Sequence, residues 1–248
     1  MVFLEYVLIG FTAFISSLVS GFGGFGGGFL IVLVMTPLVG VKAVIPLVSV
    51  MAFFGNLGRI YFYRKTIEWK IAIHFILASS PGVALGTNLF AWLPEKPLLG
   101  LLGAILIAIV PIRRYLKKYN IKPGIKTVLA IGFLFGLISG TAVGSGMFVI
   151  AGLTSMGIHG PLLLGTDAMI GAVNAASRLF SFWSLGILPF DFFLAGALMG
   201  AMTLPGTWLA SRMVHRMGVK RHTQLIEGLI IIGGLVFIYE ALVEKVSL

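Results

Sequence analysis

The sequence predicts an all-α polytopic membrane protein, built as two inverted repeats of five segments each, with a glycine-tipped helical hairpin opening each half. Three observations lead to this fold class. Of the 248 residues, 58% are hydrophobic and only 10% are charged. The apolar residues form long runs, and a bilayer crossing takes about 20 residues. Polar landmarks also recur at a nearly constant spacing, as expected of a duplicated chain.

The first apolar run covers residues 2–39, holds one charge, Glu5, and is interrupted by the glycine-rich stretch Ser20–Gly28. The run is too long for one membrane helix, so the glycines are expected to divide it into two arms. The second arm, Phe29–Val39, would span about 16 Å, or half a bilayer. Irregular backbone at that depth is tolerated where it is buried in protein or lines a wet cavity. The stretch is therefore a candidate binding site.

Further apolar segments follow in both halves. In the first half they cover about Ala43–Tyr63, Trp69–Leu93 and Leu98–Ile112. In the second half they cover about Thr127–Ser139, Met147–Met156, Pro161–Leu185, Phe190–Ala210 and Leu225–Leu242. We therefore predict an N-terminal repeat at residues 1–112, a basic cytoplasmic linker at 113–126 and a C-terminal repeat at 127–248.

Landmark residues recur between the two halves. The separation is 119 positions for Ser20-Gly21 and Ser139-Gly140, for Gly27 and Gly146, and for Arg59 and Arg178. It is 118 for Asn56 and Asn174, and 124 for Pro81-Gly82 and Pro205-Gly206. A duplication with a short insertion accounts for these offsets.

Charge fixes the expected orientation and excludes several functions. The net charge is +10, but the Lys and Arg residues lie in short loops, as the positive-inside bias predicts, so no nucleic-acid partner is expected. Placing the three basic loops in the cytoplasm makes the halves start on opposite sides, the arrangement of many secondary transporters. Cysteine is absent and the four His do not cluster, so we expect no metal, no cofactor and no enzymatic activity. The N-terminus lacks the features of a cleavable signal peptide.

The two glycine tips are expected to meet near the bilayer midplane and to bind a small anion. A helix N-terminus carries unpaired amides and a partial positive charge, which favour anions. The alternative is that these glycines only permit close helix packing. The candidate residues of the two tips are Ser20, Gly23, Gly24, Gly26 and Gly27, and Gly144, Ser145 and Gly146.

Arg59 and Arg178 are the strongest side-chain candidates for substrate binding, since a cation within the membrane usually has a partner or a purpose. The alternative is that each extends its guanidinium to the lipid-water interface. Asn56 and Asn174 lie one turn earlier on the same segments. They could donate amide hydrogens to the substrate or join helices to one another.

Asp167 is the one acidic side chain well inside the apolar segments of the second half. It has three alternative roles: an ion-coupling site that binds a proton, a salt-bridge partner of an Arg on a neighbouring helix, or a hydrated residue near the cytoplasmic mouth. Its spacing from Asn174 and Arg178 places all three on one helix face.

The run Ser20-Gly21-Phe22-Gly23-Gly24-Phe25-Gly26-Gly27-Gly28-Phe29-Leu30 resembles the TauE/SafE family of sulfite and organosulfonate exporters. The resemblance extends to Pro37, to the Asn56 and Arg59 pair, to the weaker second copy at Ser139–Met147, and over essentially the whole chain. It implies a multi-pass transporter of the cytoplasmic membrane that moves sulfite, sulfoacetate or other small organic anions and is driven by an ion gradient.

These observations predict a secondary transporter whose anion binds between the two glycine tips. Its partners would be a small anionic substrate, the lipid bilayer and a coupling ion, either proton or sodium, and a homodimer is compatible with the chain. An anion channel with the same half-helix site and an exporter of carboxylates are the alternatives. An intramembrane enzyme is disfavoured because no nucleophile is paired with a base.

Overall fold

The computed structural model describes most of the chain up to residue 213. The described residues are 11–18, 20–21, 27–94, 96–98, 100–101, 103–104, 107–108, 111, 115, 125–141, 145–156, 158, 160–213, 231, 235, 238–239 and 242. They are helical apart from short turns, and they contain no strand. The all-α prediction is therefore confirmed over the described residues. Most of the predicted linker and of the segment Leu225–Leu242 lies outside them.

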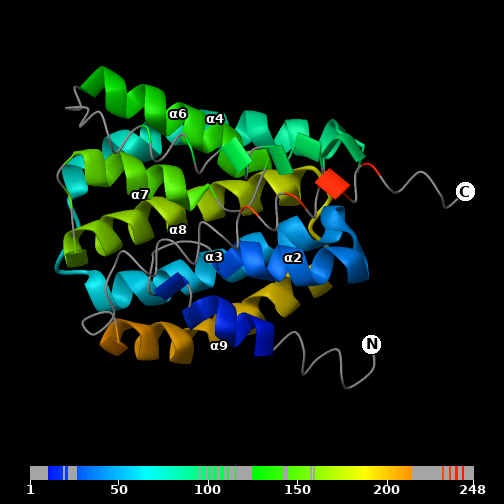
Figure 1. The fold of residues 1–248 in the computed structure, drawn as a ribbon, viewed down its shortest axis with the longest axis horizontal. Helices are drawn as coiled ribbons and strands as arrows, with labels where there is room; N and C mark the ends of the chain where they lie inside the picture. Colours follow the sequence, from blue (N-terminus) through cyan, green and yellow to red (C-terminus); the bar gives the residue numbers. More distant parts are fainter. Residues whose placement is uncertain are drawn as a thin grey trace, which may run out of the picture.

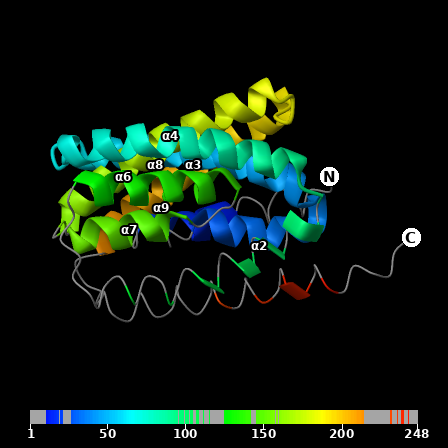
Figure 2. The same cartoon turned by 90° about the horizontal axis from the view of Figure 1, so that it is seen from above.

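The helices begin and end close to the apolar segments of the sequence. They are α2 (Gly27–Val39), α3 (Val41–Tyr63), α4 (Trp69–Trp92), α6 (Ile125–Thr141), α7 (Gly146–Ser155), α8 (Gly160–Ser184) and α9 (Phe190–Met213). Figures 1 and 2 show them side by side with their long axes roughly aligned. Three are long and apolar enough to cross a membrane: α3, α4 and the part of α9 up to Leu209. α8 is as long but carries Asp167, Asn174 and Arg178.

Two short helices each turn sharply into a long one at a glycine. Gly40, between α2 and α3, has φ 78°, and Gly160, at the start of α8, has φ 61°. A side chain at either position would be strained, because L residues rarely adopt positive φ. Gly40 is the single residue between α2 and α3, and Gly160 is the first residue of α8.

α3 and α8 form the centre of the bundle and run antiparallel. The end of α3 meets the start of α8, where the Thr66 hydroxyl donates to the Pro161 carbonyl at 3.0 Å. Further along, the backbone of Gly171 lies against the Asn56 amide. α3 also packs against α9, and α8 packs against α4. Both central helices therefore lie between partners drawn from the other half of the chain.

α4 and α6 approach each other through glycines. A methyl group added at Gly136 would overlap the Ser79 carbonyl, and one added at Gly82 would overlap the Phe133 carbonyl. Gly206 of α9 makes a related approach to the helical residues before α2, near Phe14 and Ser17. Because small residues let backbones meet, these interfaces have the closeness typical of membrane helices.

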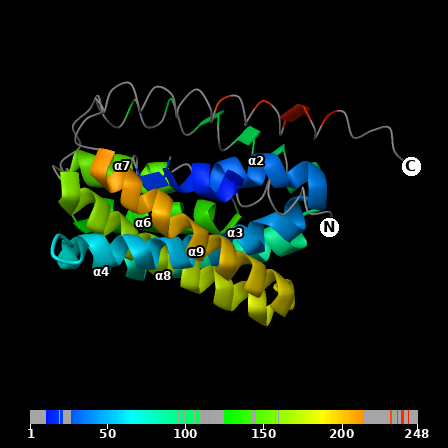
Figure 3. The same ribbon diagram turned by 90° about the horizontal axis from the view of Figure 1, so that it is seen from below.

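The surface of the bundle is strongly apolar. Leu77 is 67% exposed, Phe180 77% and Leu198 61%. Extended apolar surface of this kind is uncommon on soluble monomers but is what lipid tails require. In Figure 3 two of the helices that carry these residues, α4 and α8, lie along one edge of the bundle, and the third, α9, crosses it diagonally. The composition, the helix lengths and this surface together describe a membrane protein.

Candidate functional site

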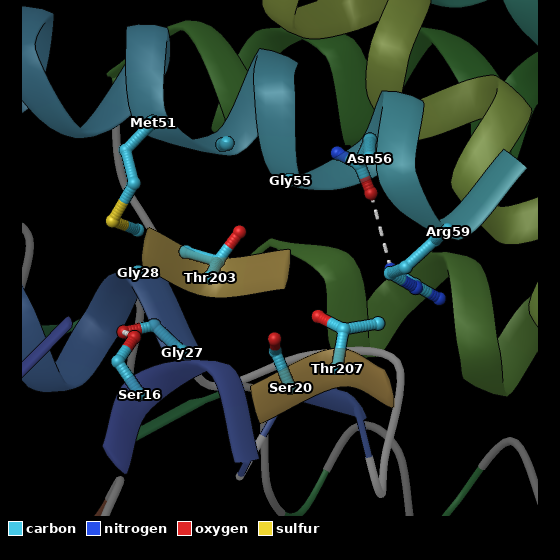
Figure 4. Close-up of a pocket in the computed structure, with 11 residues that line it drawn as sticks. Ser16, Ser20, Gly27, Gly28, Met51, Gly55, Asn56, Arg59, Thr203 and Thr207 are labelled. Atoms are coloured by element: carbon cyan, nitrogen blue, oxygen red, sulfur yellow. Dashed lines mark hydrogen bonds between the residues drawn. The ribbon is translucent and has the colours of Figure 1, made fainter. Parts of the chain in front are cut away.

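A cavity of about 120 Å³ lies between α2, α3, α9 and the helical residues that precede α2. Figure 4 shows its polar side chains converging from these elements. The lining residues are Ser16, Ser20, Gly27, Gly28, Met51, Ala52, Gly55, Asn56, Arg59, Thr203 and Thr207. Of the residues predicted to bind substrate, the cavity brings together Ser20, Gly27, Asn56 and Arg59. Its volume suits a few waters or one small anion.

The N-terminus of α2 opens onto this cavity because the preceding helical residues press against it. The Ser16 hydroxyl donates to the Gly27 carbonyl, and the Ser20 hydroxyl donates to the Ser17 carbonyl at 3.3 Å. A side chain at Gly27 would lie 2.8 Å from the Ser20 Cβ. Only glycine therefore lets the start of α2 lie this close to Ser16 and Ser20, with the backbone of Gly27 and Gly28 at the cavity wall.

Arg59 carries the only guanidinium among the cavity-lining residues, and it is 6% exposed. Its Nη2 lies 2.6 Å from Oδ2 of Asp167 and donates to the Leu164 carbonyl at 3.4 Å. Its Nη1 donates to Oδ1 of Asn56 at 3.1 Å, a bond drawn in Figure 4. Arg59 is thus buried between Asp167 and the cavity, and it does not extend to the end of its helix.

Asp167 is 4% exposed and forms the salt bridge with Arg59. Of the three roles considered for it, the salt bridge is the one for which the contacts are present. Asp167 is not among the residues that line the cavity. The Arg59 guanidinium therefore separates this carboxylate from the cavity.

The candidates of the second half lie in a separate part of the interior. Ser145 is 6% exposed, Asn174 2% and Arg178 7%, and none of them, nor Gly146, lines the cavity. Arg178 Nη1 donates to the Ser139 carbonyl at 3.0 Å, and Asn174 Nδ2 donates to the Ile170 carbonyl at 2.9 Å. Arg178 Nε and Asn174 Oδ1 are buried without a hydrogen-bond partner in the described part of the chain.

Four predicted tip residues cannot be placed. Gly23, Gly24, Gly26 and Gly144 lie outside the described residues. The expectation that the two tips face each other across one anion depends on them and stays a prediction. Within the described ranges, no three His, Asp or Glu side chains are grouped so that they could hold a metal ion.

Sequence reasoning missed three hydroxyl residues of the cavity, namely Ser16, Thr203 and Thr207. The two threonines flank Pro205-Gly206, which had been recognised only as a repeat landmark. They stand four residues apart in an apolar helix, so they share one face. That spacing, combined with the landmark, is the signal that could have found them.

Comparison with known proteins identifies a family for the chain. No curated protein and no solved structure is significantly similar to the chain. The family model described as "Sulfite exporter TauE/SafE" matches residues 9–237, which is most of the chain and includes every residue of the cavity. The protein is therefore a member of the TauE/SafE sulfite exporter family, whose members are membrane transporters.

Proposed function

We propose that this protein is a multi-pass secondary transporter of the cytoplasmic membrane that carries sulfite or small organosulfonates such as sulfoacetate. The observation that supports this most directly is the cavity in which a buried Arg59 meets the N-terminus of α2 and a ring of hydroxyls. A sulfonate group has three oxygens that accept hydrogen bonds. Arg presents a planar fork of donors to such groups, and the amides at a helix start add to it.

The proposed inverted repeat is supported by contacts that recur at the repeat offsets. Phe14 and Phe133 are 119 positions apart, and their carbonyls lie against Gly206 and Gly82. Thr203 donates its hydroxyl to the Gly200 carbonyl, and Ser79 donates its hydroxyl to the Ile76 carbonyl, 124 positions earlier.

The antiparallel course of α3 and α8 supports the proposed inversion of the repeats. These two helices carry the equivalent residues Arg59 and Arg178, and equivalent helices of inverted repeats cross the membrane in opposite directions. The same relation holds for the turns before them, since Gly40 and Gly160 are 120 positions apart. In Figure 1 the ends of α3 and α9 and the starts of α6 and α8 lie at one end of the bundle. That end holds Arg64, Lys65 and Lys126, so we place it in the cytoplasm.

The second half would form the two-fold equivalent of this cavity in the opposite state of the transport cycle. Its residues would be Ser139, Ser145, Gly146, Asn174 and Arg178. Two of them carry polar atoms that lack partners among the residues the structure describes, Arg178 Nε and Asn174 Oδ1. A buried donor and acceptor left in this condition cost free energy, and binding of substrate or water there would satisfy them. The two halves would thus bind the anion alternately, one in each state of the transport cycle.

Asp167 would couple transport to an ion, with a proton favoured over sodium. The Arg59 guanidinium binds the carboxylate on one side and borders the cavity on the other. An anion entering the cavity competes with Asp167 for that guanidinium. Protonation of Asp167 removes the competitor, so anion and proton would bind together. Sodium would instead need several oxygen ligands around Asp167.

Counterflow in proteoliposomes tests the proposal. With the membrane potential clamped at zero, vesicles loaded with unlabelled sulfoacetate should accumulate radiolabelled sulfoacetate transiently and with saturation, which a channel cannot do. Arg59→Gln should abolish the accumulation, whereas Lys70→Gln, at an exposed basic residue away from the cavity, should retain it. Carboxylates such as acetate and malonate serve as competitors. Competition by a carboxylate but not by sulfite or sulfoacetate would assign the protein to carboxylate export, and linear unsaturated flux would indicate a channel.

A further inference from the structure

A second and larger hollow lies on the outer surface of the bundle, between α3 and α9. It has a volume of about 460 Å³ and is lined by Phe54, Leu57, Gly58, Tyr61, Phe62, Gly200, Ala201 and Leu204. We call it the α3–α9 groove. It shares no lining residue with the cavity that holds Arg59. It is therefore a separate feature, and the transport proposal does not account for it.

The groove is apolar along its length and has a basic rim at one end. Tyr61 is 65% exposed and Leu204 41%, so the groove opens outward. The exposed Arg64 at the end of α3 folds back over the groove: its guanidinium carbon lies 4.7 Å from the centroid of the Tyr61 ring, and Nη1 donates to the Tyr61 carbonyl at 3.1 Å. Lys65 follows directly and is also exposed. The two cations outnumber Glu68, the single acid of this loop.

The dimensions of the groove match one leaflet of a bilayer. From Phe54 to Arg64, α3 rises about 15 Å at about 1.5 Å per residue. The hydrocarbon core of a leaflet is half of about 30 Å. An acyl chain laid along the groove would reach Phe54 near the midplane while its phosphate stood beside Arg64. The rim and the groove thus fit the two chemically different parts of one lipid molecule.

We propose that the α3–α9 groove binds the acyl chain of an anionic phospholipid, whose phosphate is held by Arg64 and Lys65. Glycines at positions 58 and 200 keep the groove open, since a methyl group at Gly58 would overlap the Leu204 side chain. The basic rim favours an anionic headgroup over a zwitterionic one, because each basic residue near the membrane surface strengthens anionic-lipid binding roughly fivefold. This inference depends on the membrane location of the protein and not on the transported anion.

Native mass spectrometry of the delipidated full-length protein tests this proposal. The probes are dioleoyl phosphatidylglycerol and dioleoyl phosphatidylcholine, added separately at equal concentrations. The wild type should retain more phosphatidylglycerol. Arg64→Gln should weaken its binding roughly fivefold and leave phosphatidylcholine unchanged. Lys70→Gln, which removes a charge from the start of α4, should keep the preference of the wild type.

Filling the groove provides the second arm of the test. Ala201 is an exposed lining residue, so Ala201→Phe should reduce the binding of both lipids. Ala84→Phe, at an exposed position on α4 outside the groove, is the matched control, and circular dichroism melting verifies that each variant is folded. Ala201→Leu replaces Ala201→Phe if the latter does not fold. Unchanged lipid retention in a folded groove-filling variant overturns the proposal. The proposal is also overturned if the groove-filling variant loses a dimer while lipid binding stays intact, which would assign the groove to a second copy of the chain.

Discussion

Arg59 of α3 and Asp167 of α8 form a buried ion pair that joins the two halves of the chain, with Nη2 2.6 Å from Oδ2. Neither side chain is more than 7% exposed. Arg59 also donates a hydrogen bond from Nη1 to Oδ1 of Asn56. This bond and the ion pair use different nitrogens of the guanidinium, so they do not compete. The pair therefore links the stability of the bundle to the chemistry of the cavity, and the two contributions can be separated by mutation.

Removing one member of the pair should destabilise the protein more than removing both. Asp167→Asn leaves the Arg59 cation buried without its counter-ion, and breaking such a pair costs about 3–5 kcal/mol. The double variant Arg59→Gln with Asp167→Asn leaves no buried charge at this pair and should recover much of that loss. Thermal unfolding in detergent measures Asp167→Asn, Arg59→Gln and the double variant. Additive effects in this double-mutant cycle would show that the two side chains do not interact.

Arg178→Ala should abolish sulfoacetate counterflow while the protein remains folded, if the second half supplies the equivalent site proposed above. Arg178 Nη1 contacts only a backbone carbonyl among the described residues, at Ser139, so its loss breaks no ion pair in this part of the chain. Retention of the wild-type melting temperature is the control for folding. Unchanged counterflow would remove Arg178 from the transport site.

Thr207→Val should raise the KM for sulfoacetate about tenfold, because a hydrogen bond to a charged group contributes about 1.5–3 kcal/mol. Thr207 lines the cavity and is 3% exposed. Thr87→Val is the matched control, since Thr87 is also a buried threonine but lies outside the cavity. Concentration-dependent uptake measures both variants. Equal KM values for the two would contradict the assignment of Thr207 to the anion site.

Gly136→Ala should strongly reduce the yield of folded protein, whereas Gly152→Ala should have little effect. A methyl group at Gly136 overlaps the Ser79 carbonyl, while one at Gly152 lies at an ordinary 3.5 Å from Ile131. Overpacking of this kind costs about 1–3 kcal/mol or more. Size-exclusion profiles and melting temperatures compare the two variants. A stable Gly136→Ala variant would mean that α4 and α6 are not in close contact in the membrane.

Single-cysteine labelling tests the membrane orientation, and the chain offers a clean background because it has no cysteine. Lys65→Cys and Lys126→Cys should react with an impermeant maleimide only after the cytoplasmic side is exposed. Leu185→Cys, at the opposite end of α8, should react in intact cells. Labelling of Lys65→Cys in intact cells would indicate the opposite orientation. Labelling of Lys65→Cys and Lys126→Cys from opposite sides would refute the proposed topology.

The helices could be predicted from the sequence because hydropathy and chain length fix them locally. Trp69–Leu93 was expected, and Trp69–Trp92 is observed. The partner of Asp167 could not be chosen among its alternatives, because which Arg faces it depends on how α3 and α8 pack. Which half forms the cavity was also beyond the sequence: Gly27 and Gly146 are equivalent positions of the predicted repeats, yet only Gly27 lines it. Nearly equivalent sequences can adopt different local arrangements, and the repeat pattern does not encode which half is open.

The glycine contacts between α4 and α6 have a consequence for how the protein is made. α4 comes from the first half of the chain and α6 from the second, and they meet at Gly82 and Gly136. A first half emerging from the ribosome would therefore present bare peptide backbone to lipid until α6 is synthesised. We therefore expect that neither half folds by itself: fragments divided between α4 and α6 should be degraded when expressed alone and should survive when co-expressed.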